Sequence, residues 1–282
     1  MKRRCRTSAA FLSLCALFLL TGCGREKEEQ QEQTRREIFR VTGQDEVTEP
    51  QKPQEINLDD CEEEQVFLTK GGDFWIYGSM DEGQIVVDAD EDELVHLYLA
   101  GVNISSAGGP AILVEEASKV IMTLVPETEN VLTDSPDYTD YEESRACLYS
   151  VSDLTINGNG SLRVFGYHED GIRSKDRIKL LGGSIEVQAK GDGIRGSDGI
   201  LITEAALMIQ SEQNGLRTAN QGADGKGVVE VRGGTISLIA GRNGIYAASD
   251  LYMRDCSCSV NSVEEKVRTE GAAYIAEGCL DQ

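Results

Sequence analysis

Acidic or amide residues followed by glycine recur along the second half of the chain at an almost constant spacing. The intervals are 22, 22 and 29 residues, and the longest contains a polar insertion at residues 221–227. If equivalent residues stack on successive strands, about 4.8 Å apart, their carboxylates repel one another unless a hard cation such as calcium bridges them. The alternative is a structural role, because Asp-Gly and Asn-Gly favour corners where the side chain bonds the backbone and glycine permits a positive φ. This set, called the Asx row below, consists of Asp170, Asp192, Asn214 and Asn243.

A second acidic row keeps the same spacing, six residues further along each unit. It consists of Asp176, Asp198 and Asn220. Calcium takes oxygen ligands of this kind, although ordinary solvated turns are the alternative. We therefore expect calcium as a cofactor, with ligands drawn from both rows: Asp170, Asp192, Asp176, Asp198, Asn214 and Asn220. Because the chain has only two histidines, zinc or copper sites built on imidazole are not expected.

Arginine follows three residues after the first three members of the Asx row, and a tyrosine takes the fourth position. This set, called the arginine row, consists of Arg173, Arg195, Arg217 and Tyr246. Three stacked guanidinium groups repel one another unless acids pair with them, and the neighbouring aspartates offer such pairing. The functional interpretation is that guanidinium forks bind the carboxylates of a linear uronate chain laid along the row. Aromatic platforms for sugar are few, and ordinary packing is the alternative for each: Trp75, Tyr77, Tyr98 and Tyr149.

Two apolar pairs in each unit keep the same register as these polar rows. The first pair recurs as Ile178 and Leu180, Ile200 and Ile202, Val229 and Val231, and Leu251 and Met253. The second recurs as Ile185 and Val187, Leu207 and Ile209, Ile236 and Leu238, and Cys258 and Val260. One residue separates the members of each pair, which indicates short strands with one buried face. Such units bury their apolar faces only by stacking, so we predict an all-β, right-handed parallel β-helix of about 22 residues per coil and about nine coils.

The first 23 residues have the pattern of an export signal. A basic head and an apolar stretch from Ala9 to Leu20 precede Leu-Thr-Gly-Cys, which resembles the lipobox of bacterial lipoproteins. We expect residues 1–22 to be removed and Cys23 to carry the lipid; the alternative is an ordinary cleaved signal with an incidental cysteine. Residues 23–60 are polar and charged, so they are expected to form a disordered tether. The expected location is the extracellular face of the cell membrane, with the lipid as the only membrane contact.

The net charge limits the possible partners, and the number of cysteines limits their pairing. The formal net charge is -22, and it becomes -26 from Cys23 onward because the first 22 residues hold four basic and no acidic side chains. Nucleic acid is therefore not an expected partner. Five cysteines follow Cys23, so at least one is expected to be unpaired, and Cys258 is expected in the core.

Four sets of motifs carry a resemblance to a known family. They are residues 83–88, residues 129–134, residues 153–162, and the recurrent Asp-Gly-Ile-Arg followed by Gly-Gly-Ser/Thr-Ile. Over about residues 66–262 the chain resembles the carbohydrate-binding domain-containing proteins of clostridial and related bacteria. The resemblance implies a pectate-lyase-like right-handed β-helix that binds acidic polysaccharide such as polygalacturonate, and cellulose, with bound calcium and no established catalysis. We accordingly expect the carbohydrate-binding β-helix at residues 61–262 and a cap or tail at residues 263–282.

Three classes of function are compatible with these features. The first is non-catalytic, calcium-assisted binding of uronate-containing polysaccharide at the cell surface. The second is a calcium-dependent polysaccharide lyase of the pectate type, which the resembled fold supports. The third is a structural or adhesive surface protein without glycan specificity. Arginines that repeat along a row suit binding along a polymer better than a single reaction centre, so we assign no catalytic residue.

Overall fold

The computed structural model describes residues 39–138, 144–222 and 225–281, and the chain divides into two units, residues 1–40 and 41–282. The predicted signal peptide and Cys23 lie outside the described residues. The fold below is that of the second unit. Among the described residues, no helix has the length and apolar character needed to cross a membrane.

One parallel sheet contains nine strands of the described chain, and each new strand adds to the one before it. This nine-strand sheet consists of β2 (Gln65–Leu68), β4 (Gln84–Asp88), β6 (Ile112–Glu116), β9 (Ala146–Ser150), β12 (Asp170–Ser174), β15 (Ile194–Gly196), β18 (Leu216–Arg217), β21 (Ile245–Ala247) and β24 (Val267–Thr269).

The other sheet has 16 described strands and folds into two arms, because β5 pairs with β7 through residues 94–99 and with β8 through residues 103–105. The first arm consists of β8 (Glu129–Thr133), β11 (Ser161–Gly166), β14 (Ser184–Ala189), β17 (Ala206–Ser211), β20 (Thr235–Ala240) and β23 (Ser257–Ser262). The second arm consists of β7 (Lys119–Leu124), β10 (Asp153–Gly158), β13 (Arg177–Leu180), β16 (Gly199–Ile202), β19 (Val228–Val231), β22 (Leu251–Met253) and β25 (Ala273–Ile275). The long strands β3 (Gly72–Asp81) and β5 (Leu94–Ser105) join the arms, and β1 (Gln54–Asn57) pairs with β3.

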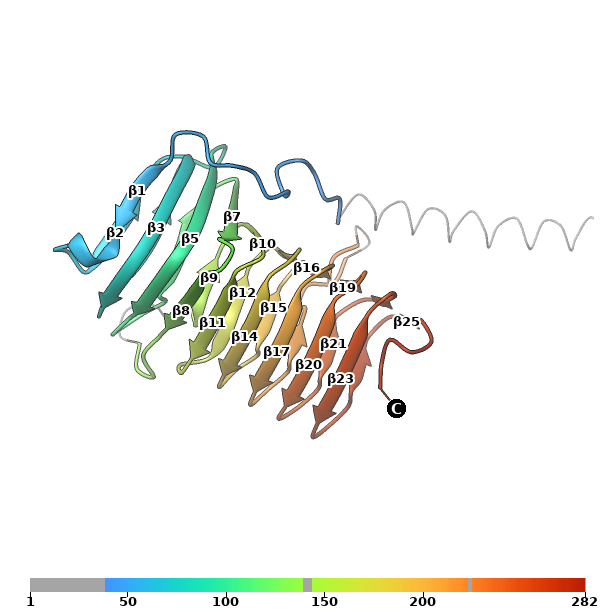
Figure 1. Cartoon of the computed structure of the whole chain (residues 1–282). Coiled ribbons are helices and arrows are strands. Elements are labelled where there is room, and N and C mark those ends of the chain that lie inside the picture. Colours follow the sequence, from blue (N-terminus) through green and yellow to red (C-terminus); the bar gives the residue numbers. More distant parts are fainter. Residues whose placement is uncertain (1–38, 139–143, 223–224, 282) are drawn as a thin grey trace, which may run out of the picture. The chain divides into compact units, whose positions relative to one another are not determined.

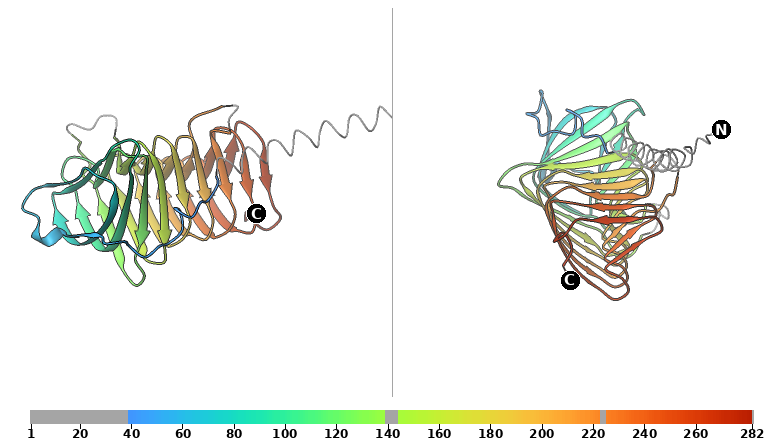
Figure 2. Two further views of the ribbon diagram at one scale, coloured as in Figure 1. Left: turned by 90° about the horizontal axis from the view of Figure 1, so that it is seen from above. Right: turned by 90° about the vertical axis from the view of Figure 1, so that its right-hand side faces the viewer.

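The three sets of parallel strands make one stack of coils, which is a parallel β-helix. Figure 1 shows the stack beginning at β1 to β5 and ending at β23 and β25, and the left view of Figure 2 shows the coils in a single row. The predicted register is confirmed in both apolar series. Ile178, Ile200, Val229 and Leu251 pair in order along the second arm, and Ile185, Leu207, Ile236 and Cys258 pair in order along the first. All eight side chains are at most 3% exposed, so the predicted burial of Cys258 is also confirmed.

The glycines that follow the Asx row are needed for close packing of stacked backbones. The positive φ considered in the structural alternative is not used, because none of these glycines has a left-handed conformation. A Cβ added at Gly193 would lie 2.2 Å from Cγ2 of Ile209 and 2.7 Å from the carbonyl oxygen of Gly215. The repeat therefore selects glycine here because the next coil approaches too closely for any side chain.

The β-helix extends beyond both predicted boundaries. Strand β1 pairs with β3 before residue 61, with Ile56 opposite Ile76, and Leu58 in the short helix η1 (Leu58–Asp60) is 2% exposed. The tether prediction is therefore wrong for residues 54–60. Ile56 and Leu58 lie among charged and polar residues, so they give no periodic pattern in the sequence. The single strand β1 nevertheless covers the first coil. At the other end, β24 and β25 continue both sheets past residue 262, where a separate cap or tail was expected.

Candidate functional site

The arginine row is a vertical line on the nine-strand sheet, as predicted. Arg173 pairs with Arg195, Arg195 with Arg217, and Arg217 with Tyr246 on successive strands. The structure adds a residue at each end, because Tyr149 pairs with Arg173 and Tyr246 pairs with Arg268. Arg268 lies 22 residues after Tyr246, so the repeat spacing alone was sufficient to find it.

Only part of this line reaches the surface. Tyr149 is 1% exposed and packs with Val86 and Leu113, so it serves packing and offers no platform for sugar. The exposed fraction of the side chains rises from 19% at Arg173 to 31% at Arg217 and 46% at Arg268. With strands about 4.8 Å apart, the accessible stretch from Arg173 to Arg268 is about 19 Å long.

The neighbouring aspartates pair with the outer arginines and leave the central one without a direct partner. Nη1 of Arg217 lies 3.1 Å from Oδ2 of Asp192, and Nη1 of Arg173 lies 3.9 Å from Oδ2 of Asp170. Arg195 forms no ion pair with any residue that the structure describes, although both aspartates attract it. Burial and the repulsion of Arg173 and Arg217 lower the pKa of Arg195. Structural pairing therefore explains the outer members of the row better than its centre.

The row also keeps hydrogen-bonding capacity that the protein does not use. The Nε atoms of Arg173, Arg195 and Arg217 are buried without a hydrogen-bond partner among the described residues. Buried donors without a partner lower the stability of the folded state, so three of them in one row are not explained by structural pairing alone. The Cζ atoms of Arg217 and Arg268 lie 5.8 and 5.9 Å from the centre of the Tyr246 ring, where cation–π attraction holds both arginines.

A small cavity opens at this end of the row. Its volume is about 180 Å³, and three arginines and one tyrosine face amide side chains across it. The lining residues are Asn214, Arg217, Arg242, Asn243, Tyr246 and Arg268. Such a lining provides donors for carboxylate and hydroxyl groups together with one aromatic face.

The Asx row is a buried hydrogen-bonded ladder beside the arginine row. Oδ1 of Asp170 accepts a bond from the backbone N–H of Asp192 at 2.8 Å, and Oδ1 of Asp192 accepts Nδ2 of Asn214 at 2.7 Å. Oδ1 of Asn214 in turn accepts Nδ2 of Asn243 at 2.9 Å. All four residues are at most 4% exposed. The ladder therefore holds the turns in register, which is the structural alternative considered from the sequence.

Asp170 is the member of this ladder whose carboxylate is least stabilised by its surroundings. Burial and the charge of Asp192 raise the pKa of Asp170 to about 7. Its Oδ2 atom is buried and accepts no hydrogen bond from the described residues. The carboxyl therefore holds a proton over part of the pH range in which exposed aspartates are ionised.

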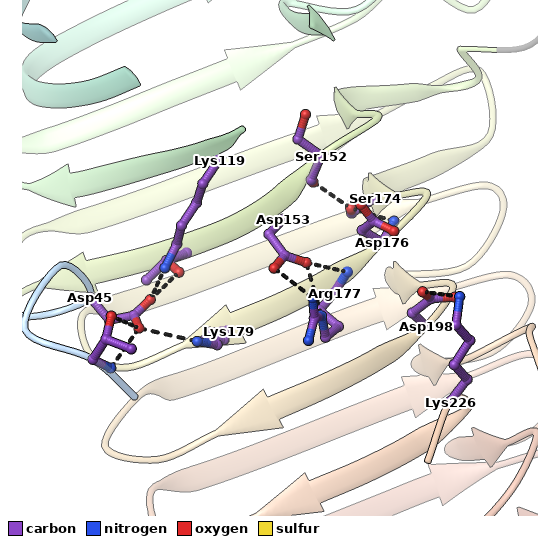
Figure 3. A network of polar contacts seen from close by, with 12 residues as sticks. Asp45, Lys119, Ser152, Asp153, Ser174, Asp176, Arg177, Lys179, Asp198 and Lys226 are labelled. Atoms are coloured by element: carbon purple, nitrogen blue, oxygen red, sulfur yellow. Dashed lines mark hydrogen bonds and ion pairs between the residues drawn. The ribbon is translucent and has the colours of Figure 1, made fainter. Parts of the chain in front are cut away.

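The second acidic row lies at another corner of the coils (Figure 3). Both carboxylate oxygens of Asp198 have partners, since Oδ1 accepts Nδ2 of Asn220 at 2.5 Å and Oδ2 lies 2.7 Å from Nζ of Lys226. Burial and the charges of Asp153 and Asp198 raise the pKa of Asp176. Asp176 is thus the half-buried carboxylate of this row that a cation would stabilise most.

The two acidic rows do not form a complete metal site by themselves. Within the described ranges, no group of three His, Cys, Asp or Glu residues is placed to hold a metal ion. The oxygens of Asp192 and Asp198 already accept bonds from arginine, lysine or amide groups. The side-chain geometry therefore offers no support for calcium in the Asx row, and calcium binding stays a prediction.

The fold and the arginine row together define the class of protein: a parallel β-helix that presents a long, repetitive surface on one sheet. The chain belongs to the carbohydrate-binding domain-containing protein family, whose profile matches residues 62–279.

The chain is also similar to two individual proteins. It is 41% identical over 222 residues to a carbohydrate-binding domain-containing protein of Acetivibrio thermocellus, which covers 77% of this chain and 78% of that protein. Its structure is similar to that of a polysaccharide lyase-like protein from C. thermocellum, solved as a gadolinium derivative. That likeness has a TM-score of 0.76 and 32% sequence identity, and it covers 78% of this chain and 91% of the other.

Proposed function

We propose that the protein binds uronate-containing polysaccharide along the arginine row without cleaving it. The observation that carries this proposal is the line of three cationic side chains on successive strands, Arg173, Arg195 and Arg217, which Tyr246 and Arg268 continue, on a protein whose net charge is -22. In this proposal the coils are right-handed, the hand that parallel crossovers favour. The polymer lies along the stack, so consecutive carboxylates meet the guanidinium groups of Arg173, Arg195 and Arg217 at a spacing similar to the length of one sugar unit.

The repetition of the site supports binding rather than catalysis. A lyase needs one base placed at the proton that it removes, and general base catalysis depends on that single geometry. The arginines instead occupy equivalent positions on consecutive strands. Equivalent positions on consecutive strands suit contacts with successive units of a polymer, which is the behaviour of a carbohydrate-binding surface.

Lyase activity is the second candidate function, because this chain has a fold similar to that of a polysaccharide lyase-like protein. One experiment separates the two functions. The purified protein is incubated with polygalacturonate, and retention on the polymer and ultraviolet absorbance of unsaturated chain ends are both recorded. Retention without growing absorbance supports the binding function, and growing absorbance contradicts it. Absence of both favours a structural or adhesive protein.

The same experiment tests charge specificity and calcium. Fully methyl-esterified pectin, which lacks free carboxylates, serves as the neutral control, and the proposal requires weaker retention on it. Loss of retention with EDTA, restored by calcium, would support the calcium prediction. Unchanged retention with EDTA would leave the arginine row as sufficient and would contradict that prediction.

We also propose that the protein is exported and held by a lipid on Cys23 at the outer face of the membrane. The support is the order of basic head, apolar stretch and Leu-Thr-Gly-Cys at residues 20–23. Mass spectrometry of the mature N-terminus is the test, with the Cys23→Ala variant as control. A diacylglyceryl cysteine at position 23 is expected, and an unmodified or uncleaved terminus would contradict the proposal.

A further inference from the structure

The segment that precedes β1 inserts one carboxylate into a buried site on the second arm. Asp45 is fully buried, although it lies in a segment predicted from the sequence to be disordered. Its Oδ1 atom accepts hydrogen bonds from Nζ of Lys119 and from Oγ1 of Thr155, the latter at 2.8 Å, and its Oδ2 atom lies 3.1 Å from Nζ of Lys179 (Figure 3). Thr42 donates to Oδ2 from both its backbone N–H, at 2.8 Å, and its hydroxyl, at 3.0 Å.

The donors of this pocket belong to the β-helix and come from three successive coils. Lys119 is on β7, Thr155 on β10 and Lys179 on β13, which are neighbours in the second arm. Asn157, also on β10, donates from Nδ2 to the backbone oxygen of Asp45 at 2.8 Å. The coils therefore assemble the pocket, and the preceding segment supplies its occupant.

The electrostatics of the pocket require an anion. The side chains of Lys119 and Lys179 are 13% and 9% exposed. Burial lowers the pKa of Lys179, Asp45 opposes this effect, and the charge of Lys119 lowers the pKa further. Burial would raise the pKa of Asp45, but hydrogen bonds from Lys119, Thr42 and Thr155 hold it well below its usual range. Asp153 also attracts Lys179 but forms its ion pair with Arg177, whereas Asp45 contacts both ammonium groups, so its loss would be strongly unfavourable.

Stacked aromatic rings lie beside the pocket, and Tyr98 among them is buried while the segment is in place. Tyr98 is 2% exposed, and its hydroxyl lies 3.2 Å from Oγ1 of Thr48. Trp75 stacks on Tyr98 with ring centres 5.9 Å apart. Tyr98 pairs with Thr123 on the next strand, and Thr123 pairs with Asn157 of the pocket. A carboxylate site and stacked aromatic rings thus adjoin, and the ring face of an acidic sugar reaches Tyr98 only when the segment is displaced.

We propose that Lys119, Thr155 and Lys179 form a second carboxylate-binding site, for the acid group of a uronic acid, which Asp45 closes as a built-in ligand. The site lies on a different sheet from the arginine row, and this inference does not depend on the function proposed for that row. Saccharide binds here when the segment around Asp45 is displaced from the second arm.

The test is chemical rescue of the full chain by small carboxylates. Asp45→Ala opens the pocket, and we expect a lower Tm than in the wild type because Lys119 and Lys179 lose the carboxylate that contacts them both. Acetate or galacturonate then binds the folded state and raises the Tm in proportion to the logarithm of its concentration above Kd. Sodium chloride at the same ionic strength and neutral galactose are the controls, and neither restores the Tm.

Two further variants make the outcome specific. Asp45→Asn fills the pocket with a neutral group of the same shape, so acetate has no effect on it. Asp45→Ala combined with Lys179→Met removes half of the charge that attracts the ligand and abolishes most of the rescue. Equal effects of acetate and chloride on Asp45→Ala would overturn the proposal. Rescue by acetate but not by galacturonate would overturn its assignment to an acidic sugar. If Asp45→Ala does not fold, the same comparison is made on the yield of refolding.

Discussion

Replacing Arg195 by methionine distinguishes a binding role from a structural role, because the two roles predict opposite changes in stability. Methionine keeps much of the apolar stem and removes the charge. Arg195 lies between Arg173 and Arg217 at the strand spacing of about 4.8 Å. Two unit charges at about 4 Å in water interact by about 1 kcal/mol, and two such repulsions are offset in part by Asp170 and Asp192. We expect Arg195→Met to raise the free energy of unfolding by about 1 kcal/mol, or the Tm by about 2–4 °C.

The same variant is expected to weaken polysaccharide binding. A hydrogen bond to a charged group contributes about 1.5–3 kcal/mol, which corresponds to a loss of affinity of about tenfold to hundredfold. Isothermal titration with oligogalacturonides gives the affinity, and thermal unfolding without ligand gives the stability.

The matched control for this variant is Arg163→Met. Arg163 lies on β11 in the first arm and pairs with Glu129 at 3.3 Å and Glu186 at 3.4 Å. Its replacement should leave binding unchanged and should not raise the Tm. Wild-type affinity in Arg195→Met, or a Tm below that of the wild type, would refute the reasoning about the row.

Three other predictions concern the scaffold. Gly193→Ala should destabilise the protein by about 1–3 kcal/mol because its Cβ meets Ile209 at 2.2 Å, whereas Gly43→Ala, with no atom within 4 Å, should be neutral; denaturant unfolding of both variants measures the difference. Leu216→Ala, at a fully buried position, should cost about 2–5 kcal/mol in the same assay, and a smaller loss would mean that the coils collapse around the cavity. The folded state keeps the proton of Asp170 up to about pH 7, while the unfolded state loses it near pH 4, so this residue lowers stability as the pH rises through that window. Asp170→Asn should therefore become progressively more stable than the wild type between about pH 4 and pH 7, and a constant difference in Tm across that range would contradict the raised pKa.

The register of the repeat was predictable because every unit has its apolar residues at the same positions in the sequence. Ile178, Ile200 and Val229 face the core at the same position of consecutive coils, so their spacing gives the strand pairing directly. The arginine row follows from the same spacing. The reason for the recurrent glycine within the units was not predictable, since the space for a Cβ at Gly193 is closed by the backbone of Gly215 only once the coils are stacked.

The sequence by itself determined the β-helix, the vertical arrangement of Arg173, Arg195 and Arg217, and the acidic character of the protein, because each depends on residue type and period alone. Only the tertiary structure decided that the Asx row is a buried ladder whose oxygens are already bonded. It also decided that Asp45 enters a pocket built by Lys119 and Lys179, 74 and 134 residues away. Such contacts have no period, and the energy of a buried charge depends on which distant groups the folded chain places around it.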